Sequence, residues 1–136
     1  MLNKKTITRL RLIEQFILSE PRRFDMWEAV TPASGSPGML EQPPCGTACC
    51  IAGAAYLVGR KIKNLNSRRF AWGDVKPFAA NYFGLTFEQS QRLFYPTSNA
   101  WGQVYHDAYQ NAKSPLERAY VGVARIEHFI ATNGDE

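Results

Sequence analysis

Apolar residues recur with a helical period along most of this chain. Over residues 4–18 they return every three or four positions, while most lysines and arginines of the segment fall outside that stripe. This spacing predicts an amphipathic helix with one buried face. The side chains expected in that face are Ile7, Leu10, Ile13 and Ile17, widened by Leu12 and Phe16.

Proline and glycine mark the irregular parts of the first half of the chain. Pro21 ends the predicted first helix, because proline disfavours helical geometry in the residue before it. Residues 22–30 carry apolar side chains, among them Phe24 and Trp27, so this segment is expected to pack down as a short turn or helix. Residues 31–44 are rich in proline and glycine and are predicted to form a long loop.

The most apolar run of the chain, residues 48–58, is predicted to be a buried central helix. It is apolar on every face, which is typical of a helix surrounded by other helices. The hydroxyl of Thr47 is expected to cap its start. Gly59 follows directly and is expected to end it.

The second half of the chain contains further predicted helices. Residues 74–83 are expected to form a short helix that ends at Gly84. Pro77 lacks a backbone N–H, so this helix is expected to hold it in the first turn. Residues 99–112 are predicted to form a single longer helix.

Two capping-box patterns add helix starts. Thr86 is followed three residues later by Gln89, which predicts a helix that continues to Phe94. Ser114 and Glu117 have the same spacing and predict the start of the last helix. The apolar stripe expected on that last helix is Leu116, Tyr120, Val123, Ile126 and Ile130.

Together these patterns predict an all-α protein, a single-domain irregular helical bundle over residues 1–136. No segment shows sustained alternation of apolar and polar residues, so no strand is expected. A length of 136 residues suits one domain with one core. The apolar run at 48–58 is about half of the roughly 20 residues that span a bilayer, so no membrane association is expected.

Three cysteines at positions 45, 49 and 50 do not suit a disulfide framework and favour a reducing, cytoplasmic location. No apolar stretch near the first residues resembles a secretory signal. Cys45 and Cys49 are four residues apart and a histidine could complete a zinc site with them. A structural zinc site usually has two close ligand pairs, and the second pair is missing, so the sequence predicts no metal and no cofactor.

The segment at 45–53 offers chemistry because a helix start favours negative charge. A thiol there ionises more readily, so Cys45 or Cys50 is a candidate nucleophile, with His128 as its base. The backbone N–H groups at a helix start also suit an anionic ligand, which makes Thr47 a candidate binding residue. The alternative is that Cys49 and Cys50 are small side chains that fill a crowded helix junction.

A second candidate surface is the basic segment that follows the central helix. The chain has a formal net charge of +4, and positive side chains concentrate here beside an aromatic residue. Such a segment suits phosphates, nucleotides or an acidic protein surface, although no recognised nucleic-acid-binding fold accompanies it. The candidate binding residues are Arg60, Lys61, Lys63, Arg68, Arg69 and Trp72.

The residues Cys45-Gly46-Thr47, Cys50 and Ala52-Gly53 resemble the Cys-Gly-Thr-x-x-Cys-x-Ala-Gly signature of small proteins encoded by bacteria, prophages and phages. The resemblance extends over most of the chain, and that family has no established activity. It implies a bacterial or phage origin and draws attention to Cys45, Thr47, Cys50 and His128. The extra Cys49 and the long loop before Cys45 depart from the usual pattern.

These observations favour a non-enzymatic, phage- or prophage-associated accessory protein. Its expected partner is a host or bacterial protein, such as a component of a defence system, or a small anionic ligand. Nucleic acid is a less favoured partner. The alternative is a cysteine-dependent hydrolase or transferase that uses Cys45 or Cys50 with His128.

Overall fold

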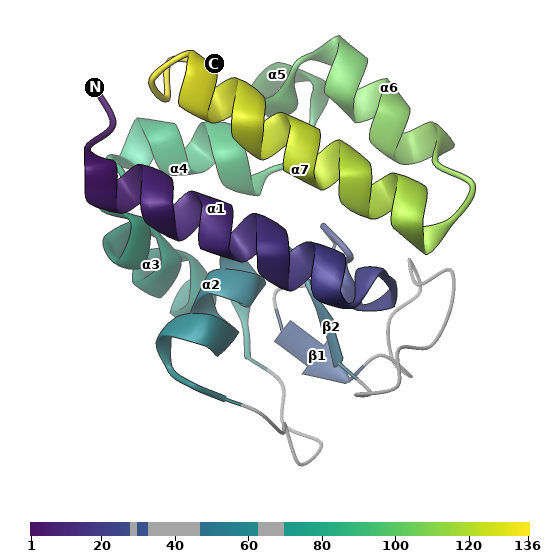
Figure 1. Cartoon of the computed structure of the whole chain (residues 1–136), viewed down its shortest axis with the longest axis horizontal. Helices are drawn as coiled ribbons and strands as arrows, with labels where there is room; N and C mark the ends of the chain where they lie inside the picture. The colour runs from purple at the N-terminus through teal and green to yellow at the C-terminus, as the bar shows by residue number, and fades with distance from the viewer. Residues whose placement is uncertain (28–29, 33–46, 63–69) are drawn as a thin grey trace.

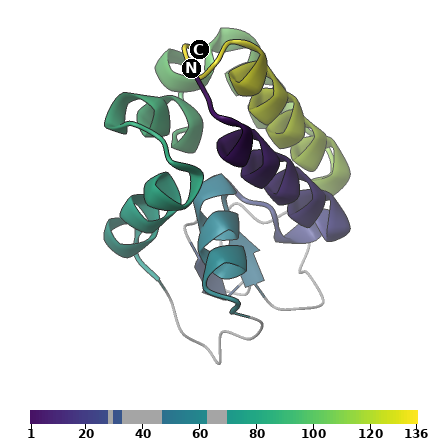
Figure 2. The same cartoon turned by 60° about the vertical axis from the view of Figure 1, so that its left-hand side comes forward.

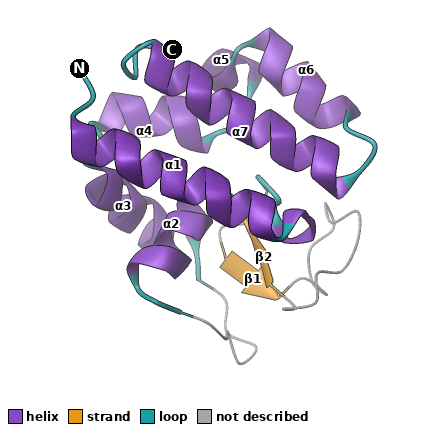
Figure 3. Ribbon diagram, viewed as in Figure 1, coloured by secondary structure: helices purple, strands orange, loops and turns teal. Residues whose placement is uncertain are grey.

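The computed structural model describes residues 1–27, 30–32, 47–62 and 70–136 (Figure 1). Within these ranges the chain is mainly helical, with one short 3-10 helix and one pair of short strands (Figure 3). The expected helical fold is confirmed. In chain order the elements are α1 (Lys4–Ser19), η1 (Pro21–Arg23), β1 (Val30–Pro32), β2 (Thr47–Cys49), α2 (Ile51–Gly59), α3 (Trp72–Phe83), α4 (Phe87–Phe94), α5 (Ser98–Trp101), α6 (Gln103–Asn111) and α7 (Pro115–Ala131).

The two longest helices, α1 and α7, lie side by side and run in opposite directions (Figures 1 and 2). Helices α2 and α3 pack against α1, whereas α4 and α6 pack against α7. The contact between α1 and α7 and the contacts of α4 with α2 and α3 join these two groups of helices. The two ends of the described chain lie close together (Figure 2).

Helix α1 confirms most of the predicted amphipathic pattern. The side-chain oxygen of Asn3 accepts a hydrogen bond from the N–H of Thr6 at 2.8 Å and caps the helix start. Three of the expected stripe residues, Leu10, Ile13 and Ile17, are buried. Leu12 does not join them, because it lies on the solvent side with about half of its surface exposed.

Helix α2 is the buried central helix that the sequence predicts, but it begins later than predicted. Every residue from Ile51 to Leu57 is buried. Residues 47–49 form strand β2 instead, and this strand pairs with β1 in antiparallel register. The prediction of a Thr47 cap is therefore wrong. The helix is capped by Cys50, whose Sγ accepts from the N–H of Gly53 at 3.3 Å.

Helix α2 ends at Gly59, as predicted, with Arg60 as its C-cap. Gly59 also serves packing. A Cβ atom at position 59 would lie 2.8 Å from the ring of Phe78 on α3. The glycine therefore permits close contact between α2 and α3.

Helices α3 and α4 follow the predicted signals with one correction. Gly84 adopts a φ of 72° and ends α3, as predicted. The helix starts at Trp72, however, so Pro77 lies in its second turn rather than its first. Both hydrogen bonds of the capping box between Thr86 and Gln89 are present at the start of α4.

The single helix predicted for residues 99–112 is two helices. Gly102 adopts a φ of 85° between them, a conformation that a side chain disfavours, and the chain changes direction there. The short helix α5 is held by Trp101, whose indole N–H donates to the carbonyl of Leu93 at 2.9 Å. A local glycine conformation therefore outweighs the continuous helical pattern.

Helix α7 has the predicted start but buries a different face. Ser114 caps it, whereas the carboxylate of Glu117 accepts from the N–H of Lys113, so the predicted capping box is only half formed. Two expected core residues, Leu116 and Tyr120, are about half exposed, which makes the predicted stripe wrong in its first turns. The residues that α7 buries are Ala119, Gly122, Arg125, Ile126 and Phe129.

The rotation of α7 places Arg125 inside the protein. Its guanidinium donates to the main-chain oxygens of Arg92 and Glu136, each at 3.1 Å, and of Ala100 at 3.3 Å. Burial lowers the pKa of Arg125 to about 10, so the group remains protonated at neutral pH. One buried cation thus connects α7, the end of α4, α5 and the segment after α7.

In the part of the chain that the structure describes, no helix is both long enough and apolar enough to cross a membrane.

We predict that Gly122→Ala destabilises the fold. A Cβ at this position would lie 2.6 Å from the ring of Phe24, which is itself buried and packed edge-on against Tyr109. Overpacking of this kind costs about 1–3 kcal/mol. The free energy of unfolding in urea measures the effect. Gly73→Ala is the matched control, because a Cβ there meets no atom within 4 Å; equal stability of the two variants contradicts the prediction.

The free energy of unfolding should also depend on pH through Glu14, which lies on α1 near Glu127 of α7. Burial and the nearby charge of Glu127 raise the pKa of Glu14 to about 7 from an ordinary value of 4.5. Because the pKa of Glu14 is higher in the folded state, the folded state keeps this proton at pH values where the unfolded state releases it. The stability that the protonated Glu14 contributes is therefore fully present below pH 4.5 and is lost as the pH rises through 7.

Glu14→Gln should therefore raise the melting temperature more at pH 8 than at pH 4, measured by thermal unfolding. Glu88→Gln, at a carboxylate that is mostly exposed, is the control and should change the melting temperature little at either pH. A Glu14→Gln effect that is equal at both pH values, or larger at pH 4, would refute the assignment.

Candidate functional site

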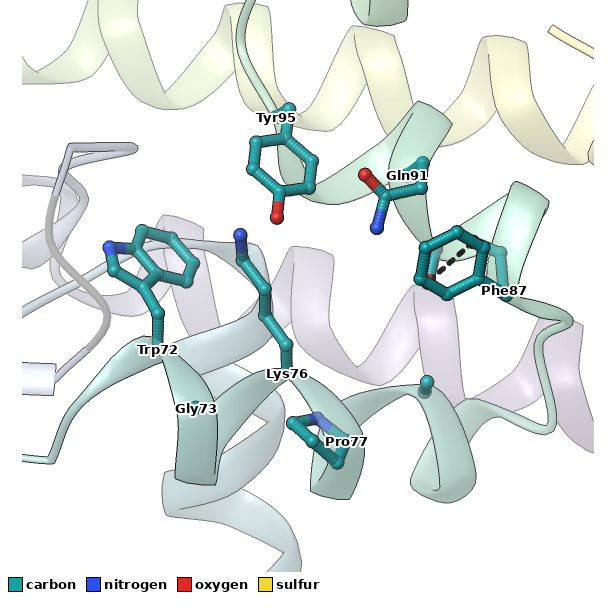
Figure 4. Close-up of a pocket in the computed structure, with 9 residues that line it drawn as sticks. Trp72, Gly73, Lys76, Pro77, Phe87, Gln91 and Tyr95 are labelled. Atoms are coloured by element: carbon teal, nitrogen blue, oxygen red, sulfur yellow. Dashed lines mark hydrogen bonds between the residues drawn. The ribbon is translucent and has the colours of Figure 1, made fainter.

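A cavity of about 540 Å³ lies between α3 and α4 (Figure 4). Its volume is within the range of small-molecule sites in proteins. The wall is mostly apolar and aromatic. The described residues that line it are Trp72, Gly73, Lys76, Pro77, Ala80, Phe87, Ser90, Gln91 and Tyr95. We call this cavity the Lys76 pocket.

Helical spacing brings these side chains together. Trp72 and Lys76 are four residues apart on α3 and therefore share one face of that helix. Phe87 and Gln91 are likewise four residues apart on α4, and Tyr95 is the residue that caps its C-terminal end. The two faces oppose each other across the pocket (Figure 4).

The Lys76 ammonium is held between two aromatic rings. Its Nζ lies 3.3 Å from the ring centroid of Tyr95 and 4.3 Å from that of Trp72. Both distances are within the range of cation–π attraction. No acidic residue is among the described residues of the wall. The pocket therefore presents a positive charge without a carboxylate partner among these residues.

Of the polar side chains of the wall, Ser90 is already used and Gln91 is not. The Ser90 hydroxyl donates to the carbonyl of Phe87 at 2.7 Å. The Gln91 amide is partly buried and makes no hydrogen bond within the described part of the chain. Gln91, together with Phe87 and Tyr95, also lines a neighbouring hollow of about 390 Å³ on the α5 side.

Of the binding residues predicted from the sequence, Trp72 lies in this pocket. Arg60 lies elsewhere, with its guanidinium 5.3 Å from the ring centroid of Tyr56, and Lys61 is exposed just beyond α2. Thr47 is in strand β2, where only its backbone is described. The other predicted basic residues, Lys63, Arg68 and Arg69, lie outside the described residues.

The structure does not give Cys50 the properties of an activated nucleophile. Its side chain is fully buried, and burial raises the pKa of the thiol to about 12. This direction is opposite to the lowered pKa expected at a helix start. The packing role considered for Cys49 and Cys50 agrees with the burial of both side chains. Cys45 lies outside the described residues.

His128 lies in a different recess, of about 390 Å³, near the end of α7. Its Nε2 is 3.6 Å from a carboxylate oxygen of Glu136, and its ring lies 5.3 Å from that of Tyr105. None of the contacts of His128 in the described part of the chain is with Cys50. Within the same residues, no group of three or more His, Cys, Asp or Glu side chains is arranged to hold a metal.

The residues that the sequence interpretation missed are Lys76, Phe87, Gln91 and Tyr95. The available signal was the spacing of four between Trp72 and Lys76 and between Phe87 and Gln91, although Trp72 lies two residues before the helix predicted for 74–83. That spacing shows which side chains share a helix face. It does not show that the two faces oppose each other, which depends on tertiary packing.

The chain matches no protein-family model, no curated protein and no solved structure. The resemblance of residues 45–53 to small bacterial and phage proteins therefore stays a prediction.

We predict that Cys50 resists alkylation in the folded protein. A buried thiol with a pKa of about 12 is almost entirely protonated at pH 7.5, and only the thiolate reacts. Iodoacetamide labelling followed by peptide mass spectrometry should show Cys50 reacting roughly a hundredfold or more slowly in buffer than in concentrated urea. Equal rates in the two conditions would contradict the prediction and favour the cysteine-enzyme alternative.

Proposed function

We propose that this protein binds a small anionic molecule with an aromatic or other flat apolar part, and that it binds this molecule in the Lys76 pocket. The observation that carries the proposal is the Lys76 ammonium, held on the faces of Tyr95 and Trp72 with no acidic residue in the described wall. It acts as a binding protein and not as an enzyme.

The charge of the pocket favours an anion. A carboxylate or phosphate beside Lys76 forms a charge-assisted hydrogen bond, which is stronger than a neutral one. The apolar wall excludes part of the surrounding water and so reduces the screening of that bond. The formal net charge of +4 on the whole chain adds a weaker attraction of the same sign.

The shape of the wall favours a flat apolar group next to the anion. Trp72, Phe87 and Tyr95 supply aromatic surface around the cavity (Figure 4). Phe87 is mostly exposed, and a ligand that covers it removes apolar surface from water. A simple inorganic anion would leave that surface exposed and is expected to bind weakly.

This proposal develops one of the two partners expected for an accessory protein. The other, a host or defence-system protein, stays a prediction, as does a phage or prophage origin. The alternative of a cysteine-dependent enzyme lacks support at Cys50, because its thiol is buried and its pKa is raised.

Calorimetric titration with phenyl phosphate tests the proposal. Lys76→Met keeps most of the side-chain length and removes the charge, so it should weaken phenyl phosphate binding by about tenfold or more. Lys5→Met, at an exposed lysine on α1, is the matched control and should leave binding unchanged. Inorganic phosphate lacks the aromatic ring and phenol lacks the phosphate, so each should bind more weakly than phenyl phosphate.

Two results would contradict the proposal. One is the absence of phenyl phosphate binding to the unmodified protein at millimolar concentration. The other is a Lys76→Met variant that binds as tightly as the Lys5→Met control.

A further inference from the structure

The side-chain amide of Gln91 is a polar group in the wall of the Lys76 pocket that the proposed function leaves unused. It extends from α4 into the Lys76 pocket, beside Tyr95 and between that ring and Phe87 (Figure 4). It is partly buried and makes no hydrogen bond within the described part of the chain. A ligand that covers this amide either pairs with it or removes it from water without a partner.

Removal of the Gln91 amide from water without a partner is unfavourable, because a polar group that loses water without gaining a hydrogen bond weakens binding. A primary amide offers one carbonyl acceptor and an NH2 donor side by side. The ligand that complements it presents a donor and an acceptor on adjacent atoms. Adenine has this arrangement, and glutamine pairs with it through two hydrogen bonds.

The surroundings of Gln91 suit a base of this kind. Aromatic rings lie on both sides of the amide, at Phe87 and Tyr95, and bases stack on such faces. The ammonium of Lys76 lies on the other side of the same cavity, where it can contact a phosphate as a point charge (Figure 4). Amide, rings and ammonium together match the hydrogen-bonding edge of a base, its flat faces and a phosphate.

We infer that the ligand of the Lys76 pocket is a purine nucleotide of the adenine type, with its base edge paired to Gln91 and its phosphate on Lys76. This inference rests on the proposed function, since it requires an anion at Lys76. It adds that Gln91 is a specificity-determining residue, which selects the base and not the phosphate.

Calorimetry with three probes tests the inference, and the first probe is adenosine 5′-monophosphate. The second, purine riboside 5′-monophosphate, lacks the 6-amino donor. The third, phenyl phosphate, has a ring and a phosphate but no hydrogen-bonding edge. Adenosine monophosphate should bind about tenfold or more tightly than either of the other probes. Gln91→Leu should remove this preference. Gln110→Leu, at an exposed glutamine on α6, is the matched control and should preserve the preference.

The outcomes separate the two proposals. If phenyl phosphate binds at Lys76 but adenosine monophosphate gains nothing over it, the nucleotide inference is wrong and the proposed function stands. If Gln91→Leu weakens the binding of adenosine monophosphate and phenyl phosphate equally, Gln91 is not a base-reading residue. If no probe binds the unmodified protein, both proposals fail.

Discussion

Arg125 brings a positive charge into the interior of the protein, where its guanidinium donates hydrogen bonds to three main-chain oxygens. A buried cation is costly unless hydrogen bonds replace its lost water, and these come from Arg92, Ala100 and Glu136. These three residues lie in three separate parts of the chain, so each part must keep its position relative to α7. The requirement sets how α7 is rotated about its own axis. It also explains why Leu116 remains partly exposed although the sequence predicts it in the core.

The Lys76 pocket depends on this arrangement because one of its two walls is α4. Arg125 holds the last turn of α4 through the carbonyl of Arg92, three residues before Tyr95. The opposite wall, α3, is fixed independently by its close packing on α2 at Gly59. The pocket therefore lies where two groups of helices meet. This position explains how an ammonium comes to lie between rings from two different helices.

Local signals predicted the fold well and long-range pairings poorly. The capping interactions of Thr86 and Ser114 formed because each involves residues within a few positions of the other. The pairing of β1 with β2 joins residues far apart in the chain, and three-residue strands are too short to show a periodic pattern. In the site, Trp72 was predicted because basic residues precede it. Lys76 was missed because an isolated lysine on a helix is ordinary until its neighbours in space are known.

We propose that aromatic anions bind between α3 and α4. Nuclear Overhauser measurements on the unmodified protein with saturating phenyl phosphate test it most directly, because they report which side chains lie within about 5 Å of the ligand ring. We expect contacts from the phenyl protons to the rings of Trp72 and Tyr95. Contacts confined to other aromatic residues, such as Tyr105 beside His128, would contradict it.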